Sequence, residues 1–205
     1  GFDVVTWKND TNTTFKSIPH NLGKKPEMIW LKDRDSTSVD FYKKWKVWHS
    51  GLTPLNGVLN SRYIVLDRGD AETNSGNMWG ESDSDINENS FRYYTGIVGN
   101  TSSVIAVLFA SVDGISKLGS YTGNGSTTGP TVTTGFQPRL IIAKAATGSG
   151  GWLIYDSLRG FGTNQLTLNS INGHSNSSDT FDVSSTGFSI VDDSPVVNGS
   201  SESYI

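Results

Sequence analysis

The sequence predicts an all-β fold built from two tandem antiparallel β-sandwich modules with a jelly-roll-like plan. The first observation is composition. Of 205 residues, 35% are hydrophobic and only 18% are charged, and glycine alone contributes 23. Such a composition is typical of short strands joined by many turns. The second is turn chemistry, because Asn-Gly dipeptides, which favour type I′ turns, begin at Asn56, Asn124, Asn172 and Asn198.

The third observation is an internal repeat. Four segments of the first half have counterparts in the same order in the second half, which predicts one module used twice. We place module 1 at residues 1–117 and module 2 at 118–205. The paired segments are Thr6–Asp10 with Ser120–Asn124, Leu22–Lys32 with Phe136–Lys144, Trp45–Ser50 with Trp152–Ser157, and Ser90–Tyr93 with Gly187–Ile190.

Runs of β-branched, aromatic and other apolar residues predict the strands. In module 1 these are Phe2–Trp7, Glu27–Lys32, Arg62–Leu66, Phe91–Tyr94 and Val104–Ala110. Glu27–Lys32 is apolar on both sides and is expected to be central. Val104–Ala110 is expected to be fully buried. In module 2 the strands are Leu118–Thr122, Arg139–Lys144, Trp152–Tyr155, Gln165–Leu168, Phe181–Val183 and Phe188–Val191.

No amphipathic helix of three turns is expected, and a single helical turn is placed near Ser50–Leu55. Aligned on Ser103 and Ser203, module 2 lacks most of the counterpart of Val104–Ala110. We expect this strand to come from residues outside the sequence, with a second chain as the alternative source.

Charge and residue content exclude several classes of protein. The net charge is −4, and basic residues do not exceed acidic ones in either half, so nucleic-acid binding is not expected. No cysteine is present, which excludes disulfides and cysteine metal sites. The longest apolar run, Val104–Ala110, is far shorter than a membrane-spanning helix, so membrane insertion is not expected.

Lysines alternate with aromatic residues over residues 41–49, which suggests a platform for sugars or anionic polysaccharide. If it exists, the platform consists of Tyr42, Lys44, Lys46 and Trp48 on one side of a strand. The alternative is an ordinary strand, with Phe41, Trp45 and Val47 in the core and lysine stems along it.

The remaining chemically suggestive residues favour no reaction. The acidic run at 81–85 lacks a calcium-loop signature and is expected to be a solvated loop. Arg68-Gly69-Asp70 spells an adhesion tripeptide that also arises by chance. His20, His49 and His174 share no metal-ligand spacing, and no nucleophile elbow occurs. We therefore expect no enzyme activity, no cofactor and no metal.

The motifs of both halves together resemble a module repeated in tail-fibre and virion-surface proteins of bacteriophages, notably those of cyanobacteria. In module 1, Lys8–Thr11 departs from the Thr-Gly-Asn-Gly of that pattern, and an insert rich in Lys and Trp precedes Trp48. The segments that carry the resemblance are Tyr121–Gly125, Gly135-Phe136, Pro138–Lys144, Trp152–Ser157, Pro19–Gly23, Pro26–Lys32 and Trp48–Ser50.

The resemblance implies a β-sandwich in a non-enzymatic virion structural protein, with no catalytic residues. It implies a place on the particle surface, in a tail fibre, an appendage or a capsid decoration, and a contribution to host attachment. The expected partners are other virion proteins, copies of the chain itself in a homo-oligomer such as a trimer, and host surface polysaccharide. The alternative function is a lectin-like, carbohydrate-binding module. A depolymerase is the third class considered, and none of its signals is found.

Overall fold

The computed structural model describes residues 1–10, 13–37, 43–54, 57, 59–74, 76–161, 164–171 and 180–205. It divides the chain into two compact units. The first comprises residues 1–65 and 72–111, and the second comprises 66–71 and 112–205. The structure thus assigns residues 112–117, which the sequence placed in module 1, to the second unit, together with a short excursion at 66–71.

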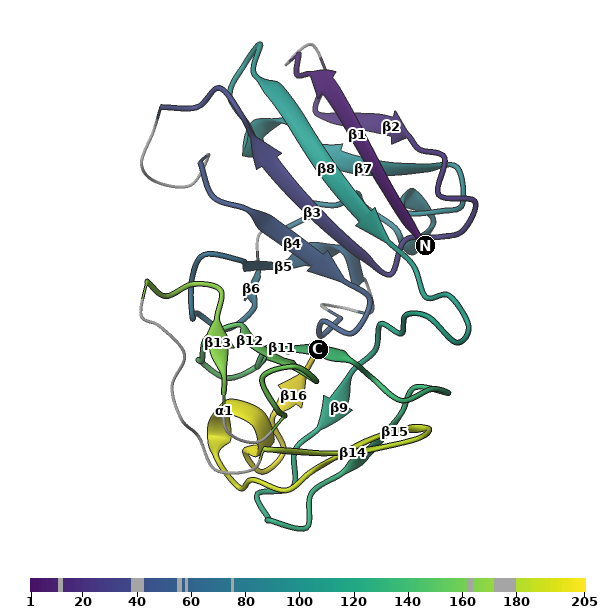
Figure 1. The fold of residues 1–205 in the computed structure, drawn as a ribbon. Coiled ribbons are helices and arrows are strands. Elements are labelled where there is room, and N and C mark those ends of the chain that lie inside the picture. Colours follow the sequence, from purple (N-terminus) through teal and green to yellow (C-terminus); the bar gives the residue numbers. More distant parts are fainter. Residues whose placement is uncertain are drawn as a thin grey trace. The chain divides into compact units, whose positions relative to one another are not determined.

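The first unit consists of antiparallel strands and 3₁₀ turns (Figure 1). Its elements are β1 Phe2–Lys8, β2 Phe15–Pro19, β3 Met28–Asp33, β4 Lys46–His49, η1 Leu59–Ser61, β5 Arg62–Val65, β6 Thr73–Asn74, η2 Asp83–Asp85, β7 Ser90–Tyr94, η3 Thr95–Ile97 and β8 Ser103–Phe109. Six of the strands form one sheet in the order β1-β8-β3-β4-β5-β6, and β2 pairs with β7 separately.

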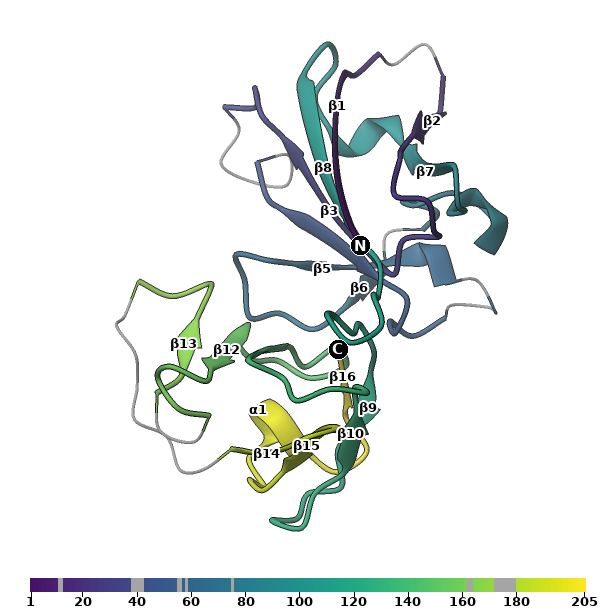
Figure 2. The same cartoon turned by 45° about the vertical axis from the view of Figure 1, so that its right-hand side comes forward.

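The β2–β7 pair packs on one side of the six-stranded sheet and closes the core of the first unit (Figure 2). Ile18 of β2 and Phe91 and Tyr93 of β7 share this core with Ile29 and Leu108 of the large sheet. The Trp7 indole donates a hydrogen bond to the Tyr93 hydroxyl at 2.9 Å. Each apolar layer is therefore covered by the other, as two packed sheets require.

The other side of the six-stranded sheet is only partly covered. Residues of β8 alternate between half-buried and buried, and β3 shows the same alternation. The expectation that Val104–Ala110 is fully buried is therefore wrong, since only every second side chain of β8 enters the core. The central position expected for Glu27–Lys32 is confirmed, because β3 lies between β8 and β4.

The second unit has shorter strands and one short helix. Its elements are β9 Tyr121–Thr122, β10 Thr131–Thr133, β11 Leu140–Ala143, β12 Leu153–Asp156, β13 Leu166–Thr167, β14 Phe181–Ser184, β15 Gly187–Ile190, α1 Pro195–Asn198 and β16 Ser203–Tyr204. The strands pair as β10-β15-β14, β11-β12-β13 and β16-β9. Apolar residues of β11, β12, β14 and β15 form a second core.

The two units repeat one another in strand pairing. Trp7 and Lys8 face Val104 and Ser103 in the first unit, and Tyr121 and Thr122 face Tyr204 and Ser203 in the second. In both units this pairing follows a turn with a residue at positive φ, Thr101 at 62° and Ser201 at 65°. The repeat read from the sequence therefore extends to backbone register.

The all-β class predicted from the sequence is confirmed. Every predicted strand overlaps an observed one. The predicted helical turn at 50–55 appears as a hydrogen-bonded turn around Ser50 and Gly51, and Leu55 lies outside the described residues. In the part of the chain that the structure describes, no helix is long and apolar enough to cross a membrane.

Candidate functional site

The four residues predicted to form a glycan platform do not form an exposed face. Lys46 and Trp48 belong to β4, whose side chains are buried on both sides. Trp48 is 1% exposed and lies in the core of the first unit, so it cannot stack on a ligand. Lys46 is fully buried, Lys44 is half-buried, and Tyr42 lies outside the described residues.

The prediction for Lys46 and Trp48 fails because neither side of β4 is exposed. Trp48 packs in the core of the first unit, and Val47, on the opposite side of the strand, is also fully buried. The alternation of lysine with aromatic residues suggested one solvent-facing side, but β4 lies between β3 and β5 within the six-stranded sheet and is covered on both sides.

Aromatic side chains gather instead on the outer face of the six-stranded sheet. The Phe2 and Phe109 ring centroids are 5.5 Å apart, and those of Trp30 and Phe109 are 5.0 Å apart. Strand register accounts for the cluster, because Phe109 faces Phe2 of β1 on one side and Met28 of β3 on the other. Phe2 is 65% exposed, while Trp30 and Phe109 are half-buried.

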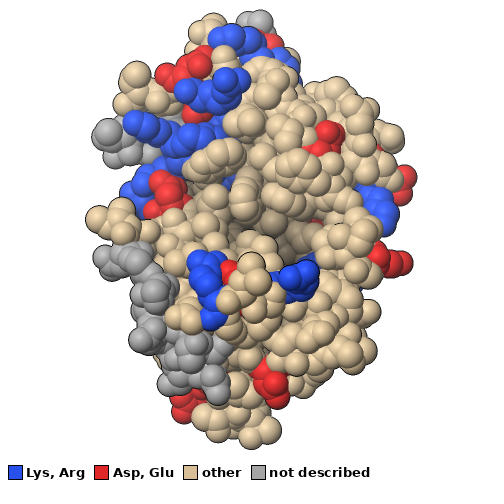
Figure 3. Space-filling model, in the orientation of Figure 1, with Lys and Arg blue, Asp and Glu red and all other residues tan. Residues whose placement is uncertain are grey.

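A lysine and a tryptophan extend this face along β3. The Lys32 ammonium lies 5.5 Å from the centroid of Trp45, and it also donates a hydrogen bond to the Lys43 carbonyl at 2.5 Å. Lys and Arg side chains gather in Figure 3 over the part of the first unit where Figure 1 shows the loop between β3 and β4. Basic groups therefore border the aromatic cluster.

We call this surface the outer aromatic face and define it by Phe2, Val4, Trp30, Lys32 and Phe109. Flat rings with exposed faces can stack on sugar rings, and nearby ammonium groups can contact anionic substituents. The sequence did not lead us to predict the outer aromatic face. The pattern that could have indicated it is the alternation along the strands, which places Phe2 and Val4 on one side of β1 and Trp30 and Lys32 on one side of β3.

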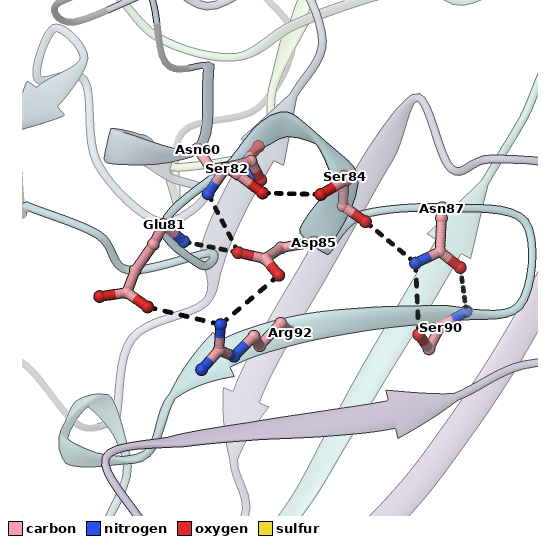
Figure 4. A network of polar contacts seen from close by, with 8 residues as sticks. All are labelled: Asn60, Glu81, Ser82, Ser84, Asp85, Asn87, Ser90 and Arg92. Atoms are coloured by element: carbon pink, nitrogen blue, oxygen red, sulfur yellow. Dashed lines mark hydrogen bonds and ion pairs between the residues drawn. The ribbon is translucent and has the colours of Figure 1, made fainter.

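The acidic run at 81–85 is engaged in structural contacts (Figure 4). The Asp85 carboxylate accepts hydrogen bonds from the backbone N–H groups of Glu81 and Ser82, at 2.7 and 3.0 Å. Arg92 of β7 lies 3.5 Å from carboxylate oxygens of both Glu81 and Asp85. These contacts account for the run without a bound ion, and the described residues contain no cluster of His, Cys, Asp or Glu suited to a metal.

The histidine singled out by the repeat also has a structural role. His49 is buried, and its Nδ1 accepts a hydrogen bond from the Gly51 N–H at 2.9 Å. Burial lowers the pKa of His49 to about 4, although the nearby Glu27 carboxylate opposes the shift. At its counterpart Asp156, hydrogen bonds from Arg159 hold the pKa of the carboxylate below its ordinary value.

The other candidates from the sequence are dispersed. Arg68 and Asp70 form a mutual ion pair at 3.5 Å with both side chains largely exposed. His20 is buried, with its Nε2 3.1 Å from the Asn87 carbonyl. His174 lies outside the described residues. The structure brings none of these described groups together into a site.

Comparison with known proteins identifies the family but no characterised relative. A family model described as a domain of unknown function (DUF7483) matches residues 1–205, so the chain belongs to that family and the match spans both units. No curated protein matches the sequence. No solved structure matches the fold.

Proposed function

We propose that this member of the DUF7483 family is a non-enzymatic structural protein of the bacteriophage particle surface, in a tail fibre, an appendage or a capsid decoration. It would contribute to host attachment through weak contacts repeated over many copies, since simultaneous contacts of linked copies add avidity. Its partners would be other virion proteins and further copies of the chain in a homo-oligomer. The proposal starts from the resemblance of its repeated motifs to phage virion modules.

The observation that carries the proposal is that the motif residues hold the backbone together. The Tyr121 hydroxyl donates to the Val197 carbonyl at 2.8 Å. A side chain at Gly123 would lie 2.3 Å from the Gly199 carbonyl oxygen, so only glycine fits there. The Asn124 N–H donates to the Asn198 side chain at 2.9 Å. A motif devoted to closing turns suits a building block.

The differences between the two units support the same reading. Asp33 in the first unit is buried and accepts hydrogen bonds from the N–H groups of Gly99 and Asp35, at 2.6 and 2.9 Å. Its counterpart by strand pairing is Ala145, which has no polar side chain. At the position of His49 the second unit carries Asp156, an acid in place of a base. The two units therefore share a backbone plan while the side chains at these positions differ.

The proposal is tested on particles of the virus that encodes the chain. Antibodies raised against the 205-residue protein should label intact, gradient-purified particles in immunogold electron microscopy. Mass spectrometry of the same particles should find the chain in stoichiometric amounts. Detection in infected-cell lysate but not in washed particles would refute a virion role.

A second candidate function, carbohydrate binding, is favoured by the outer aromatic face. Affinity electrophoresis in gels containing host surface polysaccharide would measure it. Phe2→Ala and Trp30→Ala should each weaken retardation at least tenfold. Tyr94→Ala, which removes an exposed ring of β7, is the matched control and should bind normally. Equal retardation of all four proteins would exclude this face as a glycan site.

The absence of enzyme activity is part of the proposal. Incubation with capsular or cell-wall polysaccharide should release no new reducing ends. A rise in reducing ends that scales with protein concentration would move the chain to the depolymerase class.

A further inference from the structure

Strand register determines which side chains share the outer face of the six-stranded sheet. The core contains odd-numbered residues of β1 and β3 and even-numbered residues of β8, so the residues between them lie on the outer face. Beyond β3, the Arg34 N–H donates to the Ser103 carbonyl at 2.8 Å and continues the pairing by one residue. The outer rows across β1, β8 and β3 are therefore Phe2 with Phe109 and Met28, Val4 with Val107 and Trp30, Thr6 with Ile105 and Lys32, and Lys8 with Ser103 and Arg34.

The outer face changes from apolar to basic along the strands. The first two rows are entirely apolar. Lys32 appears one row beyond Trp30, and Lys8 and Arg34 follow in the last row. Successive rows are about 7 Å apart, because they are separated by two residues along a strand. We call Lys8, Lys32 and Arg34 the basic end of the face, and Figure 3 shows Lys and Arg side chains gathered in this part of the first unit.

The cations at the basic end are only partly balanced by carboxylates. Lys8 lies 3.2 Å from Asp35, and both side chains are exposed to solvent, so this pair is weak. Lys32 contacts the Trp45 ring and a backbone carbonyl, and Arg34 is exposed. Among the described residues, neither Lys32 nor Arg34 has a carboxylate partner. Positive charge therefore collects at one end of this face, in a chain whose net charge is −4.

We propose that the outer aromatic face binds an acidic polysaccharide. Sugar rings would stack on the exposed aromatic side chains, and carboxylate or sulfate groups of the same polysaccharide would contact the basic end. Hydrogen bonds from lysine and arginine to anionic oxygens are charge-assisted and stronger than those to neutral hydroxyl groups. This inference rests on the carbohydrate-binding candidate described above and adds the chemical class of the ligand.

The distribution of charge favours a polysaccharide over a nucleic acid. A single-stranded nucleic acid carries a phosphate at every nucleotide, and proteins that bind it follow this backbone with a positively charged groove. The two apolar rows of the outer face contain no cation. A ring stacked on Trp30 would lie about 7 Å from the row of Lys32 and about 14 Å from the row of Arg34. The ligand should therefore carry acidic groups spaced along a chain of otherwise uncharged sugar rings.

The experiment compares one polysaccharide with and without its acidic groups. Host surface polysaccharide is immobilised in three forms, which are native, carboxyl-reduced and desulfated, and binding of the 205-residue protein is measured by biolayer interferometry. Removal of the recognised group should weaken binding about tenfold, and the treatment that does so identifies carboxylate or sulfate as the group. Added sodium chloride should weaken binding to the native form and not to the form that lacks the recognised group.

Three variants locate the two parts of the interaction. Arg34→Gln should weaken binding to the native polysaccharide about tenfold and leave binding to the neutralised form unchanged. Lys117→Gln removes the same charge from an exposed residue of the second unit and should bind both forms normally. Phe2→Ala should weaken binding to both forms by the same factor, because the stacking surface does not depend on the charge of the ligand.

The possible outcomes separate this inference from the proposals on which it rests. Equal affinity for the native and neutralised forms would overturn the acidic ligand and leave carbohydrate binding intact. Absence of binding to every form would overturn both. Displacement of the polysaccharide by a thymidine oligonucleotide at a lower concentration than by polysaccharide fragments would assign the face to nucleic acid instead. The labelling of intact particles tests the virion role independently of all three results.

Discussion

Replacing Asn198 with alanine should destabilise the second unit alone. The Asn198 side chain is fully buried and donates to the carbonyls of Ser126 and Asp192, at 2.7 and 2.9 Å. It also accepts the Asn124 N–H at 2.9 Å. Alanine leaves these three backbone groups without their partner, at about 1 kcal/mol net for each hydrogen bond. The free energy of unfolding should fall by about 3 kcal/mol.

For a unit of this size, such a loss lowers the melting temperature by roughly 12–24 °C. Urea denaturation followed by circular dichroism would give the free energy, and hydrogen exchange with mass spectrometry would assign it to a unit. Asn9→Ala is the matched variant in the first unit, where Asn9 is buried and donates to the Gly99 carbonyl at 3.0 Å. A loss below about 0.5 kcal/mol for Asn198→Ala would refute the reasoning.

Three further predictions concern other structural devices. Gly123→Ala should severely destabilise the second unit, because the added Cβ would clash with the carbonyl of Gly199. Gly119→Ala is the control and should be neutral, because a Cβ there has no atom within 4 Å. Thermal melts of the two variants would test the difference. Burial lowers the pKa of His49 from 6.5 to about 4. Between these two pH values the unfolded chain binds a proton at His49 that the folded protein does not, so the contribution of His49 to stability should be complete above pH 6.5 and decline toward pH 4. The His49→Asn variant should show a flatter urea-midpoint profile over that interval, and an unchanged slope would contradict this. Calcium or EDTA should leave the melting temperature unchanged, since the Glu81 and Asp85 carboxylates are already engaged by Arg92 and by backbone N–H groups. A rise in melting temperature with calcium would show a calcium site.

The sequence predicted the strands well because strand signals are local. Runs such as Glu27–Lys32 and Val104–Ala110 identify themselves by composition, and turn dipeptides separate them. The order of four repeated segments also identified the duplication. The strands β2, β6, β10 and β16 were missed. The last three have only two or three residues, which give little periodic signal, and β2 interrupts its apolar residues with lysine and serine and ends in proline.

The candidate site was harder to predict, because it depends on which side of each strand meets the core. Trp45 and Trp48 are equally apolar, and only the packing against β2 and β7 determines that Trp48 turns inward. The Trp30–Phe109 contact joins strands far apart in sequence, so no local pattern could show it. Side assignment within an apolar strand is tertiary information.

The two units close the same turn with asparagines placed on opposite sides of it. In the first unit Asn9 follows β1 and reaches the turn, donating to the Gly99 carbonyl and accepting from the Tyr93 hydroxyl at 2.6 Å. In the second, Asn198 is the last residue of α1, directly before the turn, and its side chain reaches Asn124, which follows β9. In both units, buried backbone groups near this turn need hydrogen-bond partners, and a side-chain amide from either side of the turn can supply them. The two units therefore keep the hydrogen bonding at this turn although the asparagine that provides it differs. The surfaces are under no such constraint, and they differ. The first unit presents the outer aromatic face, whereas the exposed side chains at the corresponding positions of β11 in the second unit are aliphatic, Leu140 and Ile142.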